Sequence, residues 1–576
     1  MSRSRDLLVS GARIVDVVTQ SVYDGWFTVS EGRFVEVEEG AVPAALDFEV
    51  ARRIDLGGAF VQPGMLDIHM HIESSLVTPR RFAEAVLPHG TTTILQDPHE
   101  VANVLGAPGI RWMLESSREL PLRVFTAISS CVPATSSDIE TPNASISPAE
   151  VTELAQEPEV LALGEMMDFQ GLIQDDPHLS SMLQAAWDAG LTLEGHVPSL
   201  TGPELSRYVA YGIRSDHTLM TREKLLEQLR KGLWVMVQEK SLTPEVVATI
   251  TALPDRSRVM LITDDVMPNR LLSGHLSRLV ETAVAAGWPT LDAIAAATLR
   301  PATYLGLQDL GLVAPGAKAD FLVTAALGEY PPRSVFVEGS LVAEEGATVT
   351  PVEGLRPSEP TGLHERFVTG AVTADDLRLT HTPGRQAVTA RIIEVNQVNS
   401  FTTLATRQVE LIDGVPVDED TVLATVIPRA ALRPGAAAFT PVVALVHGLG
   451  LREGGYASTF AHDSHNVFVL GRDPIAMASA LDRVLAVGGG MAFEASAGLT
   501  LLELPLAGLL SDEPIDVVAS RFDALERSLR AAGVSVKHPV LLLTLLPLSV
   551  SPDFKVTDLG IVDVQARRIL TPLVEA

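Results

Sequence analysis

The chain has 576 residues, which is too long for one hydrophobic core, because single cores stop growing at about 250–300 residues. Hydrophobic residues make up 46% and charged residues 20%, a composition that indicates a globular protein and excludes a largely disordered chain. The formal net charge of −29 argues against a nucleic-acid partner, since clustered Lys and Arg hold phosphate backbones, and favours a small uncharged or cationic ligand.

Short strands come first in the chain. The runs LLVSGARIVDV, YDGWFTVSEGRFVEVE and RRIDLGGAFVQPG are separated by glycine-containing turns. Similar runs return much later, in GLVAPGAKADFLVTA and PPRSVFVEGSLVAEEG. We therefore expect residues 1–62 and 311–356 to build one small β-sandwich domain from both flanks of the central region.

Eight strand-like runs alternate with helical stretches between these flanks. They are GMLDIHMH, TTTILQDPHE, LRVFTAISSCVP, VLALGEMMD, LTLEGHVP, GIRSDH, LWVMVQEK and VMLITDD. Such alternation implies a parallel sheet, and eight units predict an α/β protein with a (β/α)8 barrel at 63–310. The stretch TPVEGLRPSEPTG has the composition of a linker and leads to a further α+β domain, expected at 367–576.

The first of these strands ends in LDIHMHIESS, where polar residues share one face. His69, His71 and Glu73 point the same way, because side chains at i, i+2 and i+4 of a strand do so. Burying them is costly unless something pairs them. These residues alone leave two interpretations open: a hydrogen-bonded core network, or a metal site, since histidine is a common metal ligand.

Other strands also end in polar residues, at the side of the barrel where active sites of this fold lie. These residues are Asp97, His99, Glu100, Glu165, His196, His217, Asp264 and Asp265. Singly, each has a structural explanation, since a lone histidine is more often a hydrogen-bonded structural residue and an Asp often caps the next helix.

Six of these residues together favour two metal ions. The set comprises His69, His71, Glu165, His196, His217 and Asp264. Four imidazoles and two carboxylates exceed the needs of one tetrahedral zinc. Mixed nitrogen and oxygen ligation suits Mn, Fe or Zn, and two metals that share a water generate a strong nucleophile at neutral pH.

The motifs resemble those of the adenine deaminases of the amidohydrolase superfamily. The resemblance is carried by PGMLDIHMHIESS, LPHGTTTILQDPHEVANVLG, GEMMDF, EGHVPSLTGPELSRYVAYGIRSDH, LITDD, AHDSHNVFVLGRDP, VGGGMAF, LPLAGLLSDEP and LPLSVSPDFKVTDLGIVDV. It covers nearly the whole chain. The HxH motif after Pro-Gly is shared across the superfamily, whereas HIESS, LPHGTTT, DPHE, GEMM and HDSHN together are more specific.

The resemblance implies metal-dependent hydrolysis of adenine to hypoxanthine and ammonia at a two-metal centre of Mn²⁺ or Fe²⁺. It implies that His69 and His71 bind one metal ion and that His196 and His217 bind the other. Glu165 would bridge the pair. Asp264 would contact a metal and handle the proton of the hydrolytic water.

The chemistry of adenine adds further candidates. Attack at C6 builds negative charge toward N1, so a general acid must protonate N1 and a proton must reach the departing amine. Asp264 is the candidate shuttle, and Glu73 or the His99–Glu100 pair could supply the N1 proton or anchor the purine edge. The candidate catalytic residues are Asp264, Glu73 and His99. The candidates for substrate binding are Glu100, Asp97, Asp265 and Ser241.

The chain departs from the usual family motifs at two strand ends. After strand six it reads SDHT, so that Thr218 replaces an acid, and after strand seven it reads QEKS (238–241), without the usual arginine. These changes leave the metal ligands intact. They leave open an N6-substituted adenine or another aminopurine as substrate.

Three other functional classes fit less well. A cyclic-amide hydrolase usually bridges its metals with a lysine on strand four, where this chain has Gly-Glu-Met-Met. A metal-free scaffold would lack one of the six ligands, and all are present. A cytidine-type zinc deaminase needs a P-C-x-x-C pair, and Cys131 is the single cysteine.

The C-terminal segment AHDSHN contains His462, Asp463, His465 and Asn466. It could close over the pocket or bind another ion, but physics alone favours a hydrogen-bonded turn at a domain interface. A homodimer is expected for a multidomain enzyme of this size.

The cysteine count and the apolar runs of the sequence indicate the cellular compartment. A single cysteine forms no intramolecular disulfide and gives no sign of an oxidising compartment. The first residues lack the apolar segment of a signal peptide, and the run VLLLTLLPLSV is too short to span a bilayer and contains proline. We expect a cytoplasmic protein without a membrane partner.

Overall fold

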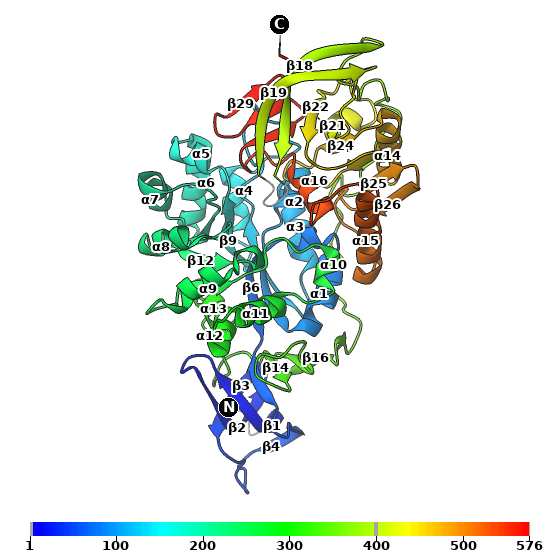
Figure 1. Cartoon of the computed structure of the whole chain (residues 1–576). Coiled ribbons are helices and arrows are strands. Elements are labelled where there is room, and N and C mark those ends of the chain that lie inside the picture. Colours follow the sequence, from blue (N-terminus) through cyan, green and yellow to red (C-terminus); the bar gives the residue numbers. More distant parts are fainter. Residues whose placement is uncertain (1–3, 397–400, 575–576) are drawn as a thin grey trace.

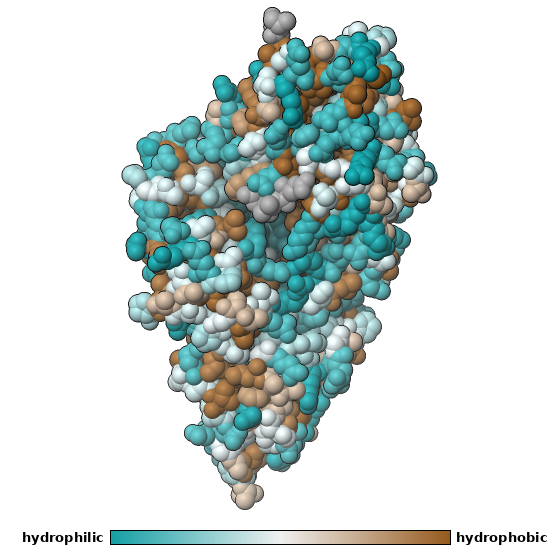
Figure 2. Space-filling view, in the orientation of Figure 1, coloured by the Kyte–Doolittle hydropathy of each residue, from teal (hydrophilic) through white to brown (hydrophobic). Residues whose placement is uncertain are grey.

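The computed structural model describes residues 4–396 and 401–574. A β-sheet that contains the N-terminal strands forms one end of the molecule, the barrel lies in the middle, and the C-terminal domain forms the other end (Figure 1). Hydrophilic side chains cover most of the face shown in Figure 2, in keeping with the net charge of −29.

Strands from both flanks of the barrel form one nine-stranded sheet. They are β1 (Ser4–Asp16), β2 (Ser21–Ser30), β3 (Arg33–Glu39), β4 (Glu49–Asp55), β5 (Phe60–Pro63), β14 (Phe321–Thr324), β15 (Ser334–Val337), β16 (Ser340–Glu344) and β17 (Ala347–Thr348). The flanks join where β5 pairs antiparallel with β14. Buried aromatic rings fill the core between them, with Phe321 stacked on Phe336 at a centroid distance of 4.4 Å.

The barrel has the eight strands that the sequence predicts. They are β6 (Met65–Met70), β7 (Thr91–Gln96), β8 (Arg123–Ile128), β9 (Val160–Met166), β10 (Thr192–Gly195), β11 (Ser215–Asp216), β12 (Trp234–Val237) and β13 (Val259–Leu261). The first five and the last three form parallel sheets. The Arg214 N–H donates to the Leu193 carbonyl at 2.9 Å at one seam, and the Asp264 N–H donates to the His69 carbonyl at 3.1 Å at the other.

Helices surround these strands because their apolar faces pack on the barrel (Figure 1). The α-helices are α1 (Pro79–Val86), α2 (His99–Leu105), α3 (Ala107–Ser116), α4 (Pro148–Leu154), α5 (Phe169–Ile173), α6 (Pro177–Asp188), α7 (Gly202–Ala210), α8 (Arg222–Arg230), α9 (Pro244–Thr251), α10 (Pro268–Leu271), α11 (Leu276–Ala285), α12 (Thr290–Ala296) and α13 (Leu299–Tyr304). The 3₁₀ turns are η1 (Ile72–Ser75), η2 (Leu87–His89) and η3 (Glu239–Ser241). Several helices begin with proline at the first turn, where its missing N–H costs nothing, and Ser147 forms a capping box with Glu150.

The C-terminal domain combines a nine-stranded and a three-stranded sheet with helices. Its strands are β18 (Arg385–Val395), β19 (Thr402–Ile412), β20 (Val415–Pro416), β21 (Thr421–Ile427), β22 (Ala444–His447), β23 (Gly455–Ser458), β24 (Val467–Gly471), β25 (Gly490–Ala495), β26 (Gly498–Glu503), β27 (Phe554–Thr557), β28 (Gly560–Asp563) and β29 (Arg568–Leu570). Its helices are η4 (Arg429–Leu432), α14 (Pro474–Ala486), α15 (Ile515–Ala531) and α16 (Pro539–Leu545).

One apolar cluster joins this domain to the barrel. It contains Met70 and Phe82 from the barrel side and Tyr456 and Phe522 from the C-terminal side. The two parts therefore share a core. We propose three domains with the boundaries expected from the sequence. Among the described residues, no helix is long and apolar enough to cross a membrane.

Candidate active site

The carboxyl ends of five barrel strands bring the predicted ligands together. His69 lies on β6 and Glu165 on β9. His71, His196, His217 and Asp264 follow β6, β10, β11 and β13, respectively. A parallel barrel places all these strand ends on one side, which is why residues up to almost 200 positions apart meet.

Glu165 lies at the centre of this cluster. Its Oε1 is 3.4 Å from His71 Nε2 and 3.9 Å from His69 Nε2. Its Oε2 is 2.6 Å from His196 Nδ1 and 3.2 Å from His217 Nε2. Each oxygen therefore faces a different pair of histidines. Burial opposes ionisation of Glu165, but the imidazoles of His217 and His196 outweigh it and hold the pKa of this carboxyl well below its usual range.

Asp264 completes the cluster from the opposite seam of the barrel. Its Oδ1 lies 3.4 Å from His71 Nε2, and its Oδ2 accepts a hydrogen bond from Gln238 Nε2 at 2.9 Å. The same amide nitrogen donates to the His217 carbonyl at 2.7 Å. Gln238 belongs to the QEKS segment, which differs from the usual family motif, and its amide orients Asp264. Neighbouring Asp265 accepts a hydrogen bond from the Ser74 hydroxyl.

These residues fit a divalent metal centre. His69 Nε2, which faces Glu165, is buried and has no hydrogen-bond partner in the part of the chain that the structure describes. Such an orphaned group is rare unless a ligand is missing. The groups His69–His71–Glu165 and Glu165–His196–His217 each converge closely enough to surround one ion. Four imidazoles and two carboxylates suit first-row divalent cations.

Two hydrogen bonds fix the tautomers of the paired histidines on β6. His69 Nδ1 lies 3.0 Å from Glu194 Oε2, and His71 Nδ1 lies 2.9 Å from the Asp97 carbonyl oxygen. Both contacts leave Nε2 directed at Glu165, as metal-binding histidines require. Glu194 was not among the residues predicted from the sequence. Its position in β10, two residues before His196, was the available signal.

Asp97 supports Glu165 from behind. Its Oδ1 accepts a hydrogen bond from Ser129 Oγ at 2.7 Å, and its Oδ2 accepts one from the Glu165 backbone N–H at 3.2 Å. A side chain at Gly164 would meet Asp97 Oδ2 at 1.9 Å, so only glycine permits this approach. With both oxygens engaged, Asp97 is placed to position Glu165, and its predicted role in substrate binding stays a prediction.

Replacing Glu194 with Gln tests this supporting shell. The neutral amide accepts a weaker hydrogen bond from His69 and lowers the basicity of its Nε2, so we expect Mn²⁺ affinity to fall about 10- to 100-fold. Competition with a fluorescent chelator measures it. The exposed Glu204→Gln variant on α7 is the matched control. Unchanged affinity in Glu194→Gln would contradict the role of Glu194.

Three acidic or basic candidates lie next to the cluster. His99 Nδ1 is 3.5 Å from Glu165 Oε1, and His99 Nε2 is 3.3 Å from Glu100 Oε1. Buried Glu73 accepts a hydrogen bond from the Val101 N–H at 3.4 Å through Oε1, while its Oε2 has no partner among the described residues. Burial, and then the nearby Glu100 charge, raises the pKa of Glu73 to about 7.

Comparison with known proteins agrees with this geometry. Residues 60–342 match the profile of the amidohydrolase family, and 399–568 match that of the adenine deaminase C-terminal domain. Adenine deaminase 2 of Carboxydothermus hydrogenoformans is 36% identical over 97% of this chain and 95% of its own length. The adenine deaminase of Archaeoglobus fulgidus is 35% identical over 99% of this chain and 95% of its own length. The chain belongs to the adenine deaminase family. The resemblance stated from the motifs is confirmed.

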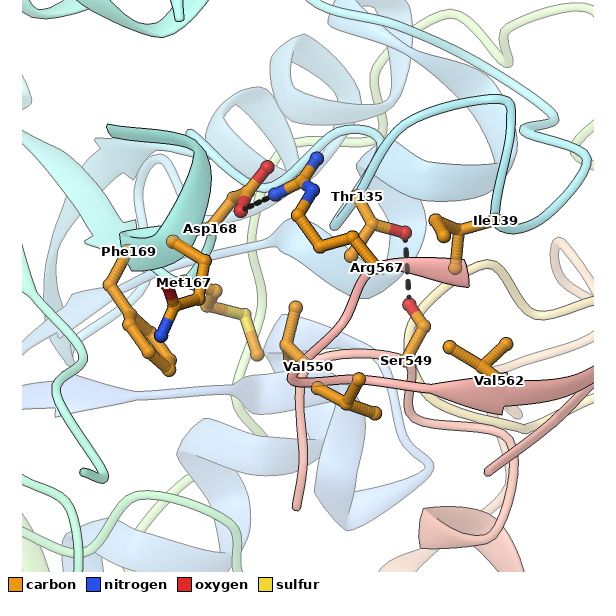
Figure 3. A pocket seen from close by; sticks show the side chains of 11 residues that line it. Thr135, Ile139, Met167, Asp168, Phe169, Ser549, Val550, Val562 and Arg567 are labelled. Atoms are coloured by element: carbon orange, nitrogen blue, oxygen red, sulfur yellow. Dashed lines mark hydrogen bonds and ion pairs between the residues drawn. The ribbon is translucent and has the colours of Figure 1, made fainter. Parts of the chain in front are cut away.

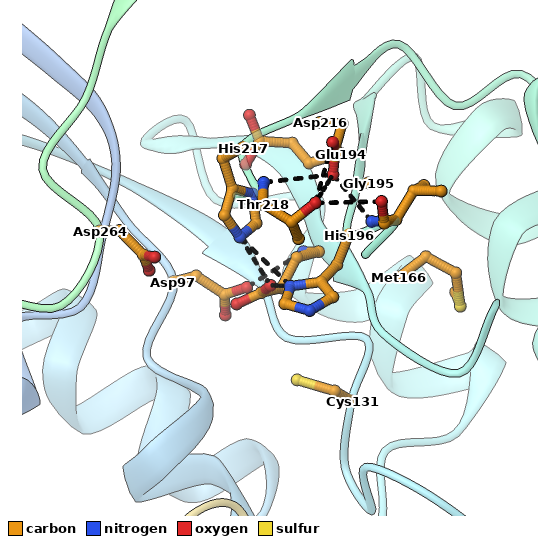
Figure 4. A network of polar contacts seen from close by, with 12 residues as sticks. Asp97, Cys131, Met166, Glu194, Gly195, His196, Asp216, His217, Thr218 and Asp264 are labelled. Carbon is orange, nitrogen blue, oxygen red and sulfur yellow. Dashed lines mark hydrogen bonds and ion pairs between the residues drawn. The ribbon is translucent and has the colours of Figure 1, made fainter. Parts of the chain in front are cut away.

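The departures from the usual motifs of the adenine deaminase family lie beside this cluster. Thr218 Oγ1 is buried and donates to the Val197 carbonyl at 3.0 Å and to Asp216 at 3.0 Å (Figure 4). Asp216 in turn accepts from the Val197 N–H at 2.8 Å, which holds the turn after His196. Thr218 therefore belongs to a network that supports the strand ends.

Ser241, like Thr218, is buried and forms a hydrogen bond that supports a neighbouring loop. Its Oγ accepts a hydrogen bond from the Met220 N–H at 3.0 Å and is buried beneath the turn. Its backbone N–H donates to the Gln238 carbonyl at 2.9 Å, and the Gln238 amide bonds to Asp264. The predicted role of Ser241 in substrate binding stays a prediction, and its hydroxyl holds the loop after β11.

The AHDSHN segment of the C-terminal domain reaches the barrel at Glu100. His462 Nδ1 lies 2.8 Å from Glu100 Oε1, and His465 Nε2 contacts Glu100 Oε2. The segment is thus a hydrogen-bonded turn at a domain interface, the interpretation favoured from the sequence. It also borders the candidate active site, which the sequence left open.

A small pocket marks the seam between the two domains nearby (Figure 3). Met167 and Phe169, just after β9, line it together with Val550 and Val562 from the C-terminal domain. Arg567 pairs with Asp168 across the seam, and Thr135 Oγ1 lies 3.1 Å from Ser549 Oγ. These contacts tie the last sheet to the loops above the barrel.

Proposed function

We propose that the protein is an adenine deaminase, which hydrolyses adenine to hypoxanthine and ammonia with two divalent metal ions. The observation that carries the proposal is the six-residue cluster around Glu165, in a chain whose relatives are named adenine deaminases over nearly their whole length. The substrate is a small purine base. We further propose a cytoplasmic location and a homodimer, which sizing of the purified protein would test.

The ligand assignment follows the two oxygens of Glu165, each of which faces one pair of histidines. His69 and His71 would hold one ion, with Asp264 nearby, and His196 and His217 would hold the other. Glu165 would be shared between the two ions. When bound, such a pair of ions lowers the pKa of a shared water and so supplies a nucleophile near neutral pH. Mn²⁺ or Fe²⁺ is the proposed metal, with Zn²⁺ as a further candidate.

The protein side chains handle the protons. Asp264 accepts protons from the attacking water, which lies between it and C6, and delivers one to the departing amine. Glu73 supplies the proton to N1, for which its unpartnered Oε2 is available. His99, between Glu165 and Glu100, orients the purine edge. The two protons of the water replace those delivered to N1 and the amine, so the reaction consumes only adenine and water.

Adenine fits better than the alternatives. Thr218 is engaged with Val197 and Asp216, and Gln238 with Asp264 and His217, so neither departure builds a separate feature for an N6 substituent. A cyclic-amide hydrolase would need a different bridging group from Glu165.

The decisive experiment follows ammonia release from adenine by the Mn²⁺-loaded protein, with chelated protein beside it. We expect turnover that is lost on chelation and returns with Mn²⁺, because the acidic and imidazole cluster alone provides no activated water. A panel of N6-substituted adenines and dihydroorotate runs in parallel. Metal-dependent turnover of a panel member without turnover of adenine would overturn the proposal.

A further inference from the structure

The loop between β23 and β24 places C-terminal side chains beside the barrel's active site. His462 is 3% exposed and Asp463 1% exposed, although both lie in a loop. A line of contacts connects them to the centre: Glu165 Oε1 to His99 at 3.5 Å, His99 to Glu100 at 3.3 Å, and Glu100 to His462 at 2.8 Å. Two side chains, those of His99 and Glu100, therefore link His462 to Glu165.

Both side chains carry a buried polar atom without a partner. His462 Nε2 and Asp463 Oδ2 make no hydrogen bond to any residue that the structure describes. Leaving such atoms unpaired costs about 1–3 kcal/mol each, more for a charged group. Two adjacent buried residues that each carry one unsatisfied polar atom indicate a ligand with a matching polar edge.

The loop is held rigidly, so these atoms are preorganised. Arg429 is fully buried and donates through Nη2 to the Thr459 carbonyl at 2.7 Å and through Nε to the His465 carbonyl. From the barrel side, Asn143 Nδ2 donates to the Ser464 carbonyl at 2.6 Å. A loop fixed from both domains binds without a large ordering cost.

The chemistry of a purine matches this arrangement. C6 and N3 lie opposite each other in the six-membered ring, so a base that presents C6 to Glu165 and Asp264 directs its N3–N9 edge away from them. That edge offers an acceptor at N3 and, in the free base, a donor at N9. We infer that His462 and Asp463 bind this edge, with Asp463 Oδ2 accepting the N9–H hydrogen bond and His462 Nε2 donating to N3.

This inference rests on the proposed function and adds a reason why the enzyme would distinguish free purine bases from purines substituted at N9. A ribose or methyl group at N9 removes the donor and leaves the Asp463 carboxylate buried and unpaired. Sites built to bind a polar hydrogen reject analogues without it by about 10⁴-fold. The C-terminal domain would thereby restrict the enzyme to free bases and exclude nucleosides.

The alternative occupant is a third cation, because His99, Glu100, His462 and Asp463 also converge within ligand distance. The purine is favoured because Glu100 is already surrounded by three imidazoles at contact distance, from His99, His462 and His465. Among the described residues, three atoms of this cluster have no hydrogen-bond partner: His462 Nε2, Asp463 Oδ2 and Glu100 Oε1. Glu100 Oε1 faces His462 Nδ1 at 2.8 Å and His99 Nε2 at 3.3 Å, so these imidazoles neutralise it without a cation.

The test compares adenine with 9-methyladenine in the Mn²⁺-loaded wild type and the Asp463→Asn variant. We expect kcat/KM for adenine to fall about 100-fold in the variant, and its preference for adenine over 9-methyladenine to shrink at least about 10-fold. The His462→Asn variant with 3-deazaadenine, which lacks the N3 acceptor, should show the same loss of discrimination. Exposed Asp516→Asn on α15 is the control.

Measurements of adenine affinity and of bound Mn²⁺ distinguish the possible occupants of the site. Calorimetry should show adenine affinity weakened in Asp463→Asn, with two Mn²⁺ equivalents in both proteins. An undiminished preference for adenine would overturn the inference while the proposed function stands. Three equivalents in the wild type and two in the variant would overturn it in favour of a third cation. No turnover of adenine by the wild type would overturn both proposals.

Discussion

Replacing Glu165 with Gln is expected to lower kcat/KM for adenine about 10³-fold and to reduce bound Mn²⁺ below two equivalents. Its two oxygens face His69 with His71 on one side and His196 with His217 on the other, at 2.6–3.9 Å. A neutral amide offers one acceptor and no charge to these sites, so the electrostatic stabilisation of the developing charge is lost. Ammonia release and metal analysis on the same sample measure both effects.

The substitution keeps the size of the side chain, so the barrel should fold. Circular dichroism verifies this, and the exposed Glu204→Gln variant controls for loss of one negative charge. If Glu165→Gln bound two equivalents of Mn²⁺ and deaminated adenine at the wild-type rate, the bridging assignment would be wrong.

Replacing Arg429 with Met is expected to destabilise the C-terminal domain by about 3–5 kcal/mol, the usual cost of breaking a buried ion pair. The guanidinium is 0% exposed and pairs with Glu365 at 2.7 Å. It also donates to the Ala507 carbonyl at 2.9 Å and the Thr459 carbonyl at 2.7 Å. Methionine fills the volume but leaves the Glu365 carboxylate and these carbonyls without their donor.

Scanning calorimetry measures the effect as a lower temperature for the transition of the C-terminal domain, since a multidomain chain has no single unfolding equilibrium. Arg433→Met is the control. It removes the second partner of Glu365, whose contact is also 2.7 Å, but its side chain is 45% exposed and solvent screens the loss. Equal effects of the two substitutions would show that burial of Arg429 is not what matters.

The sequence by itself determined the architecture and the residues that meet around Glu165. Strand–helix alternation and the position of polar residues at strand ends are local patterns, and each strand end of a parallel barrel lies on the same side. His69, His71, Glu165, His196, His217 and Asp264 could therefore be named before any coordinates. Eight successive strand–helix units were enough to predict a closed barrel.

Only the tertiary structure decided which residues support these ligands. The sequence predicts a substrate contact at Asp97, and the structure adds that its oxygens accept hydrogen bonds from Ser129 and the Glu165 N–H. A glutamate in a strand is a weaker sign of a metal site than a histidine, so Glu194 was not predicted. It nevertheless fixes the tautomer of His69. Which partner a buried carboxylate finds depends on neighbours from other strands, and no local pattern encodes that choice.

The contacts of the loop between β23 and β24 with the barrel could not be predicted from the sequence either. Glu100 and His465 are 365 residues apart, and they meet because two domains share an apolar core. The hydrophobic effect that joins the domains is not directional, so the sequence shows that surfaces will pack but not which polar atoms face each other across the seam. That geometry brings His462 and Asp463 to the active site, and only the folded chain defines it.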